Sequence, residues 1–363
     1  MNQPLRKTQM KLWAVVTNGE PLQALNEPDP TPQGAEVLVD VSHCGVCHSD
    51  VYFWKGEYNL GHGKVLRLTD RGVKLPRAPG HEVVGRVVAF GPEATGVKVG
   101  DRRIVYPWIG CGVCDRCKAG EDNMCAKQAS IGVVRNGGFS SRVLVPHSRY
   151  LVDPGEIDPA VAATYACSGI TVLNAIRKLG TMDPTSPVLL IGAGGLGLAA
   201  IAMLTSLGHQ NIIAVDVDEA KRRAAIDTGA TTVLDGNADD LQAQIAKAAG
   251  GTLLYALDFV NCSPTAKVAF ESLGKGGKLV LVGATGGELE ISLLSMILVP
   301  RTITGSQTGT LQDLKDVVAM ARSGKLKSIP IDHMPFDKAN EALVKLNEGK
   351  VTGRVVLERP EVG

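Results

Sequence analysis

The stretch VLLIGAGGLGLAAIAMLTSL, residues 188–207, decides how the second half of this 363-residue chain is organised. Its 20 residues carry no charge, so the stretch is long and apolar enough to span a membrane. Its glycines, however, are grouped between an apolar run and an alanine-rich run. That order is typical of a strand, a turn and a helix, and we therefore expect no membrane span here.

The glycines form a G-x-G-x-x-G pattern at Gly192, Gly194 and Gly197. Such glycines permit a tight turn, let the backbone approach a pyrophosphate and let the helix pack closely on the strand, while the helix N-terminus offers free N–H groups. Asp216 lies 19 positions beyond Gly197, where an acidic residue binds ribose hydroxyls and disfavours the extra phosphate of NADP. The pattern predicts an NAD site, although a carboxylate at a solvated turn is an alternative interpretation of Asp216.

Strand-like and helix-like segments alternate on both sides of this loop. From about residue 168 they read ITVLNAIRKLG, SPVLLIGAG, GLAAIAMLTSLG, NIIAVDVD, DEAKRRAAIDTGA, YALDFVNC and GKLVLVGA. This alternation predicts an α/β fold with a doubly wound parallel sheet. Residues 10–160 instead favour short β-strands separated by Gly and Pro turns, and TGRVVLERP near the end predicts a strand that returns to this first part.

Composition limits the partners and the compartment. The formal net charge is +1, so the chain lacks the clustered basic charge that nucleic-acid binding requires. The N-terminal MNQPLRKTQMKLW has no apolar core of a secretory signal, which favours a cytoplasmic protein. The 8 cysteines are therefore expected to be thiols or metal ligands and not disulfides.

Four of the cysteines lie on one short polar segment, CGVCDRCKAGEDNMC. They are Cys111, Cys114, Cys117 and Cys125. Four thiolates can complete a tetrahedral zinc shell and leave no open position for a substrate. The spacing predicts a structural zinc site, and an iron–sulfur cluster is the alternative.

A second cysteine-rich stretch, HCGVCHSDVYFW at residues 43–54, contains a C-x-x-C pair at Cys44 and Cys47. The pair alone fits both a zinc site and a redox dithiol. A catalytic zinc needs three protein ligands and one exchangeable position. Cys47, His81 and Cys167 each lie near a turn or an element start, but spacing alone does not show that they converge.

Five motifs resemble one known family. GVCHSD, PGHE, the four-cysteine loop, CSGITV and GAGGLG occur in the order found in zinc-dependent medium-chain alcohol dehydrogenases, and the resemblance covers essentially the whole chain. It implies a mainly β, GroES-like catalytic domain formed by residues 1–167 and 311–363, which carries both zinc sites. It also implies a Rossmann NAD-binding domain formed by residues 168–310.

The resemblance also implies roles for individual residues. Cys47, His81 and Cys167 would bind catalytic zinc, with Glu82 as a transient ligand, Asp50 behind the ligand histidine and Cys44 as a core residue. Ser49 would remove the alcohol proton, and Trp54, Trp108 and Tyr52 would shape the substrate pocket. Cofactor contacts would come from His48, Thr171, Gly192, Gly194, Gly195, Leu196, Gly197, Asp216, Lys221 and Arg354.

The implied function is a zinc-dependent oxidoreductase that reversibly transfers a hydride between an alcohol and NAD, giving an aldehyde or ketone. It would hold two zinc ions per subunit and form a homo-tetramer or dimer, because the short path from Cys125 to Cys167 resembles the tetrameric branch. Alternatives are a polyol or other secondary-alcohol dehydrogenase and an aldehyde or ketone reductase. Cys167 argues against the polyol branch, where the third ligand is commonly glutamate. A zinc-stabilised nucleic-acid-binding protein and a relative without catalysis are further alternatives.

Two features depart from the familiar members. Tyr52 occupies the position of a histidine that ends the proton relay, and a phenol is a poor base near neutral pH. The spacing from Cys47 to His81 is 34 residues, and the surplus, residues 60–77, is rich in Lys and Arg. A basic insertion could attract an anionic substrate, while a solvated or subunit-contact loop is the simpler interpretation.

Overall fold

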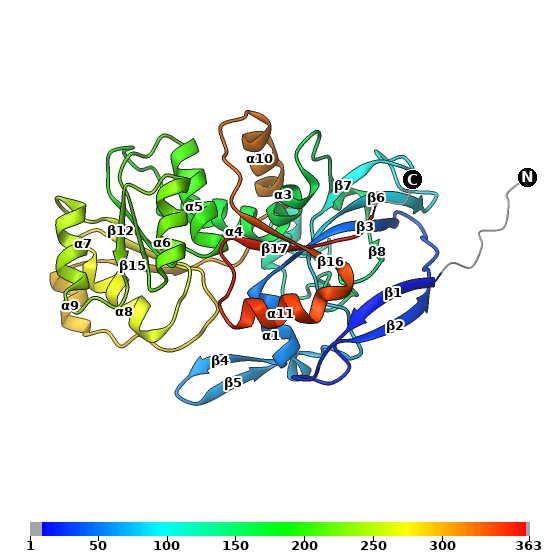
Figure 1. The fold of residues 1–363 in the computed structure, drawn as a ribbon, viewed down its shortest axis with the longest axis horizontal. Coiled ribbons are helices and arrows are strands. Elements are labelled where there is room, and N and C mark those ends of the chain that lie inside the picture. The colour runs from blue at the N-terminus through cyan, green and yellow to red at the C-terminus, as the bar shows by residue number, and fades with distance from the viewer. Residues whose placement is uncertain (1–8, 361–363) are drawn as a thin grey trace, which may run out of the picture.

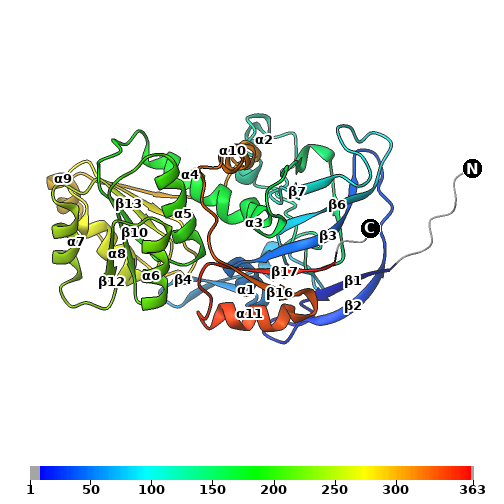
Figure 2. The ribbon, with the colours of Figure 1, turned by 45° about the horizontal axis from the view of Figure 1, so that its top comes forward.

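A computed structural model describes residues 9–360, which form two lobes joined along a central helical region (Figures 1 and 2). The expected absence of a secretory signal rests partly on residues 1–8, which lie outside the described residues. One lobe is built on a parallel sheet with helices on both faces, and the other on a mainly antiparallel sheet.

The first lobe contains a six-stranded sheet in the order β12-β11-β10-β13-β14-β15, with every neighbouring pair parallel. This is the doubly wound order, so the predicted Rossmann sheet is confirmed. Its strands are β10 (Val188–Ile191), β11 (Ile212–Asp216), β12 (Thr232–Asp235), β13 (Tyr255–Asp258), β14 (Lys278–Leu281) and β15 (Thr302–Gly305). Its helices are α4 (Ile170–Leu179), α5 (Gly195–Ser206), α6 (Glu219–Thr228), α7 (Leu241–Ala249), α8 (Ser263–Ser272) and α9 (Leu293–Leu298).

Strand β10 lies in the interior of this sheet, and all four of its side chains are buried. Val188 and Leu190 belong to the core that contains α4 and α5, whereas Leu189 and Ile191 belong to the core that contains α7 and α8. Alternate side chains of a strand point to opposite faces, so a continuous apolar run is what a sheet covered on both faces requires.

The second lobe contains a seven-stranded sheet in the order β16-β17-β3-β6-β7-β9, with β8 also paired to β3. The return strand predicted from TGRVVLERP is confirmed, because β17 pairs antiparallel with β3. The strands are β3 (Val37–Val46), β6 (Glu82–Phe90), β7 (Arg102–Val105), β8 (Arg142–Val145), β9 (Leu151–Val152), β16 (Ile331–Pro335) and β17 (Arg354–Glu358). A separate pair is formed by β1 (Gln9–Ala14) and β2 (Gln23–Pro28).

Helices join the two lobes. A helical stretch from Pro159 to Leu179 consists of α3 (Pro159–Thr164), a π-helical turn at Tyr165–Gly169 and α4. By length and composition it could cross a membrane, but 83% of its apolar window is buried inside the protein, as in a core helix. Helix α10 (Leu311–Arg322) packs against it, and α2 (Asp115–Lys118) and α11 (Ala339–Asn347) belong to the second lobe.

The surplus between Cys47 and His81 folds as a hairpin of β4 (Glu57–Gly61) and β5 (Lys64–Arg67), followed by a 3₁₀ turn at Thr69–Arg71. Figure 1 shows the hairpin extending below the two lobes toward the Rossmann lobe. At its tip the His62 N–H donates to Glu288 Oε2 at 3.1 Å. A Cβ on Gly286 would lie 2.0 Å from the Asn59 carbonyl oxygen, so the two backbones touch. The insertion therefore bridges the lobes.

Candidate active site

A cleft of about 390 Å³ lies between the lobes and is lined by residues from both. The Rossmann lobe contributes the glycine loop and the segments that follow β11, β13, β14 and β15. The other lobe contributes the start of α1 (His48–Lys55) and the turn before β17. The carboxyl ends of the parallel strands thus open into this cleft, as in other doubly wound sheets that bind ligands.

Three of the predicted metal ligands meet at this cleft. Cys47 precedes α1, His81 precedes β6, and Cys167 lies in the π-helical turn. Their ligand atoms, together with a carboxylate oxygen of Glu82, all lie within 4.8 Å of one another. The two sulfur atoms, Cys47 Sγ and Cys167 Sγ, are 4.0 Å apart.

A buried carboxylate fixes this cluster. Asp50 Oδ2 accepts a hydrogen bond from the Cys47 N–H at 2.8 Å, and its Oδ1 accepts one from the Gly80 N–H at 2.9 Å. Oδ1 also lies 3.2 Å from His81 Nδ1. Among the described residues, His81 Nε2 is buried without a partner. The carboxylate thereby holds the imidazole so that its second nitrogen is available as a ligand.

The cluster fits tetrahedral zinc. Zinc–sulfur bonds of about 2.3 Å place two sulfur ligands about 3.8 Å apart in a tetrahedron, close to the 4.0 Å found here. The hydrogen bond between the two thiols lowers the pKa of Cys47 and raises the pKa of Cys167, which is the state of a pair with one thiolate. A divalent cation among them would neutralise this charge and give His81 Nε2 its partner.

Glu82, whose carboxylate lies within this cluster, forms an ion pair with Arg354. Arg354 Nη2 donates to Glu82 Oε1, and both side chains are almost fully buried. Burial raises the pKa of Glu82, and the guanidinium opposes that shift. The same arginine lies against the glycine loop, since a Cβ on Gly195 would be 2.4 Å from Arg354 Cδ. Arg354 therefore connects the cysteine–histidine cluster to the dinucleotide loop.

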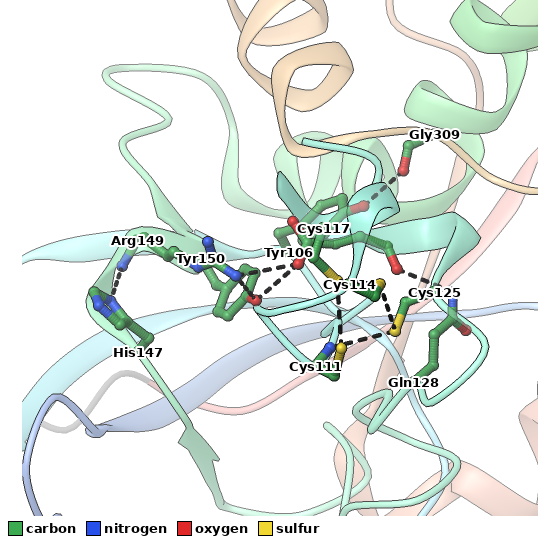
Figure 3. A network of polar contacts seen from close by, with 11 residues as sticks. Tyr106, Cys111, Cys114, Cys117, Cys125, Gln128, His147, Arg149, Tyr150 and Gly309 are labelled. Carbon is green, nitrogen blue, oxygen red and sulfur yellow. Dashed lines mark hydrogen bonds and ion pairs between the residues drawn. The ribbon is translucent and has the colours of Figure 1, made fainter. Parts of the chain in front are cut away.

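The four-cysteine segment also folds into a compact cluster. Cys114 Sγ is 3.5 Å from Cys117 Sγ and 3.8 Å from Cys125 Sγ, and Cys111 Sγ is 4.0 Å from Cys117 Sγ. These distances again match the sulfur–sulfur edges of a zinc tetrahedron. Figure 3 shows the four side chains pointing toward a common centre. Residues 111–125 form a small segment within the second lobe, between β7 and β8, and we call this segment the cysteine lobe.

The glycine loop has the geometry that its sequence predicts. Gly192 has φ of +94°, which favours glycine, and a Cβ on Gly197 would lie 1.9 Å from the Gly192 carbonyl oxygen. Asp216 ends β11, and its Oδ2 accepts a hydrogen bond from the Ala193 N–H at 2.7 Å. Lys221, on α6, lines the same end of the cleft. The glycine turn and the acidic residue that a dinucleotide site requires therefore lie next to each other.

The remaining predicted residues divide into two groups. The cleft is lined by His48, Ser49, Tyr52, Thr171 and Leu196. Trp54 and Trp108 do not line it. The indole N–H of Trp54 donates to the Glu20 carbonyl at 2.6 Å, and the Trp108 ring packs 5.3 Å from the His81 ring. Cys44 lies in the core of β3 and not in the cysteine–histidine cluster, and burial raises the pKa of its thiol.

Several lining residues went unpredicted. Ser306, Gln307 and Thr308 follow β15 and line the cleft beside Thr171. Tyr58, on the inserted hairpin, was also not predicted; it does not line the cleft itself, but its ring lies at an angle of 40° to that of Tyr52, with the ring centroids 5.2 Å apart. The strand before Ser306 is short and only partly buried, so its pattern gave a weak signal. The rule that ligands bind beyond the carboxyl ends of parallel strands could have identified the segment once β15 was recognised.

Comparison with known proteins agrees with this arrangement. The family model described as alcohol dehydrogenase GroES-like domain matches residues 33–154, and that described as zinc-binding dehydrogenase matches residues 195–323. An NAD-dependent alcohol dehydrogenase of Sulfurisphaera tokodaii is 35% identical over 96% of this chain and 99% of its own length. A D-arabinose 1-dehydrogenase (NADP(+)) of Saccharolobus solfataricus is 34% identical over 93% of this chain and 94% of its own length.

The solved structures give the same result. The alcohol dehydrogenase of Aeropyrum pernix has a TM-score of 0.87 and 30% identity, and the match covers 96% of this chain and 100% of that one. The motif order, the two sulfur-rich clusters, the doubly wound sheet and these relatives agree over nearly the whole length. The chain belongs to the medium-chain, zinc-binding alcohol dehydrogenase family.

Proposed function

We propose that this alcohol dehydrogenase uses the interlobe cleft to transfer a hydride between an alcohol and NAD, with Cys47, His81 and Cys167 as the ligands of a catalytic zinc. One observation carries the proposal: His81 Nε2, which has no hydrogen-bond partner among the described residues, meets the sulfur atoms of Cys47 and Cys167, and these two cysteines line the same cleft as the glycine loop. When bound, zinc supplies a Lewis acid that polarises the alcohol or carbonyl oxygen, and NAD supplies the hydride acceptor.

The protein's own residues would orient these groups. Asp50 holds His81 and the Cys47 backbone. Glu82, which is paired to Arg354, would be a transient zinc ligand. Gly192, Gly194 and Gly197 give the pyrophosphate access to the N-terminus of α5, with Gly195, Leu196 and His48 around it. Arg354 adds a positive charge next to this loop.

The cysteine lobe would hold a second, structural zinc through Cys111, Cys114, Cys117 and Cys125, giving two zinc ions per subunit. All four sulfur atoms are engaged with one another, which leaves no position for a substrate. The lobe therefore serves the fold, and any effect on the reaction must pass through neighbouring segments.

Asp216 supports NAD in preference to NADP. Its carboxylate lies at the carboxyl end of β11 beside the glycine loop, where it would meet the adenosine ribose, with Lys221 close by. A 2′-phosphate there would face a like charge. Thr171, whose Oγ1 is buried without a partner among the described residues, would lie against the nicotinamide end.

Ser49 is the group that would take the proton from the substrate hydroxyl, since its Oγ lies 3.8 Å from Cys47 Sγ and it lines the cleft. Tyr52 would not act as the next base. Burial raises the pKa of its phenol, and the phenol shares a hydrogen bond with Thr285. Tyr52 would therefore pass a proton only as a hydrogen-bond bridge, and water at the mouth of the cleft would receive it.

The substrate class includes a second candidate. Secondary alcohols and polyols remain alternatives to a primary alcohol, as does reduction of an aldehyde or ketone. An aldose is favoured specifically by the 34% identity to the relative named D-arabinose 1-dehydrogenase. Cys167 in place of a glutamate speaks against the polyol branch of the family.

The assembly is proposed to be a homo-tetramer or dimer of a cytoplasmic protein, with residues 1–167 and 311–363 as the catalytic domain and 168–310 as the cofactor domain. Helix α9 supports the oligomer, because Leu293, Leu294, Ile297 and Leu298 are between 61% and 84% exposed. They precede β15, the edge strand of the parallel sheet, in the chain. Such a patch is typical of a protein–protein interface.

The test is to measure NADH and NADPH formation with purified, zinc-replete protein on primary, secondary, aromatic and acid-bearing alcohols and on aldoses. We expect turnover with NAD and about two zinc ions per chain by elemental analysis. Cys167→Ser should remove one zinc and the activity, whereas Cys114→Ser should remove the other. Bound zinc and bound NADH without turnover on any substrate would show that the reaction assignment is wrong.

A further inference from the structure

Three consecutive carbonyl groups in the turn at residues 307–309 are each held by a side chain from a different part of the molecule. Asn123 Nδ2 donates to the Gln307 carbonyl at 3.0 Å, and Asn174 Nδ2 donates to the Thr308 carbonyl at 2.6 Å. The Tyr106 hydroxyl donates to the Gly309 carbonyl at 2.8 Å, as Figure 3 shows. We call these three donors the carbonyl clamp.

The clamped turn forms part of the wall of the cleft. Ser306, Gln307 and Thr308 all line it, and the Oγ atoms of Ser306 and Thr308 are buried without partners among the described residues. Thr308 has φ of +46°, a conformation that a β-branched residue rarely adopts. Such a backbone persists only where its surroundings hold it, and the clamp provides that hold.

One arm of the clamp comes from the cysteine lobe. Asn123 lies between Cys117 and Cys125, and its side chain is buried. Gln128 donates to the Asn123 carbonyl, and the neighbouring Asp122 accepts from the Tyr150 hydroxyl at 3.1 Å. These contacts fix the Asn123 backbone, so the position of its side-chain amide is set by the fold of the cysteine lobe and not by the cleft.

We propose that Asn123 is a positioning residue that couples the cysteine lobe to the cleft: by holding the Gln307 carbonyl it keeps the 306–309 turn in its strained shape, and so maintains affinity for the cofactor. This inference rests on the proposed function for the identity of the ligand. The cysteine lobe has no residue in the cleft itself. Through Asn123 it would nevertheless affect cofactor binding, in addition to its effect on stability.

The experiment compares Asn123→Ala and the isosteric Asn123→Asp with wild type by NADH fluorescence titration. Both variants remove the N–H donor, so we expect the NADH Kd to rise about fivefold, the equivalent of one hydrogen bond. Asn123→Asp should be the weaker binder, because a carboxylate would face a carbonyl oxygen. Asn174→Ala, which removes another arm of the clamp, should give a similar rise. The kcat of the variants at saturating NAD should change less than the KM for NAD.

Arg116→Ala is the matched control, because Arg116 lies in the cysteine lobe and its side chain is exposed and forms its ion pair with Glu121 of the same segment, away from the 306–309 turn. Its NADH Kd should equal that of wild type. The proposal is overturned if Arg116→Ala raises the Kd as much as Asn123→Ala, if Asn123→Asp binds NADH like wild type, or if the Kd is unchanged in all variants.

Hydrogen–deuterium exchange separates this inference from the proposed function, because it needs no cofactor. Amides of residues 306–310 should exchange faster in Asn123→Ala and at wild-type rates in Arg116→Ala. If wild type itself does not bind NADH, the cofactor assignment fails, while the exchange rates still decide whether Asn123 holds the turn. Unchanged exchange in Asn123→Ala would overturn the clamp whatever the cofactor is.

Discussion

Two glycines of the dinucleotide loop, three residues apart, should respond differently to the same added methyl group. A Cβ on Gly197 would lie 1.9 Å from the Gly192 carbonyl oxygen, whereas a Cβ on Gly194 would meet nothing within 4 Å. Gly197→Ala should therefore destabilise the protein by about 1–3 kcal/mol, as overpacking does. Gly194→Ala should leave the urea midpoint unchanged.

The same pair tests the cofactor site. The space beside Gly194 is where the pyrophosphate would approach, so Gly194→Ala should raise the NADH Kd by about tenfold, the equivalent of about 1.4 kcal/mol. Fluorescence titration alongside urea unfolding measures both effects. Normal NADH binding by Gly194→Ala would place the pyrophosphate elsewhere.

Asp50 provides a second prediction at this scale, on metal affinity. Its two oxygens hold the Cys47 and Gly80 N–H groups and His81 Nδ1, so Asp50→Asn loses both the charge and one acceptor. We expect zinc affinity at the cysteine–histidine cluster to fall about 10–100-fold. Competition with a chelator measures this, and only one of the two zinc ions should become labile. Asp70→Asn, on the exposed 3₁₀ turn, is the control and should retain both.

At the scale of single residues, the sequence was informative where chemistry requires a residue type at a fixed spacing. The four cysteines, the glycine loop and Asp216 belong to single continuous segments, so their spacing could be interpreted directly. The convergence of Cys47, His81 and Cys167 could not, because they come from three segments brought together by tertiary folding. Resemblance to a family supplied that step, and it also suggested the two tryptophans that do not line the cleft.

At the scale of elements, the contact between α4 and α10 depends on charge. Arg177 on α4 pairs with Asp313 and Asp316 on α10. Partial burial disfavours ionisation of Asp316, but its hydrogen bonds to Arg177 and Gln312 and the charge of Arg177 lower its pKa on balance. A lowered pKa means that this pair stabilises the fold above the unfolded value of about 3.9, and that the contribution is lost as the pH falls through the folded value.

Asp316→Asn should therefore lower stability at pH 7 by about 0.5 kcal/mol, a small value because the carboxylate is partly exposed. The difference from wild type should disappear near pH 3. Urea midpoints at the two pH values measure it. Glu219→Gln removes a fully solvated ion pair with Arg223 and should show no difference at either pH. A gap that widens in acid would contradict the assignment.

Most elements of the Rossmann lobe were predictable, and some of the other lobe were not. The segment HCGVCHSDVYFW contains the end of β3 and all but the last residue of α1, which no strand or helix period indicated. That helix begins because the Asp50 side chain bonds the Cys47 N–H, a local contact within a motif interpreted as metal chemistry. The inserted hairpin was expected only as a basic loop, and its contact with Gly286 and Glu288 depends on the distant lobe.

At the scale of the whole molecule, the exposed face of α9 predicts the behaviour of the assembly. Ile297 is 73% exposed, so a charge there should not disturb the core. Ile297→Asp should convert the proposed oligomer to smaller species without loss of secondary structure, because it would place charges in an apolar contact. Light scattering after size exclusion measures the mass. Val99→Asp, with 65% exposure on the other lobe, should keep the mass of wild type. A wild-type monomer would refute the oligomer.

The closing strand of the second lobe has a consequence for synthesis on the ribosome. Strand β17 lies between β16 and β3 in a sheet whose other members, except β16, are translated before residue 153, and it also brings Arg354 to Glu82. The nascent N-terminal half must therefore wait, with residues 43–46 of β3 lacking their partner strand, for some two hundred further residues. The parallel sheet, by contrast, is continuous from Val188 to Gly305 and can form first. Ribosome-bound chains should thus expose the 43–46 edge of β3 to chaperones, while released chains that contain residues 354–358 should not.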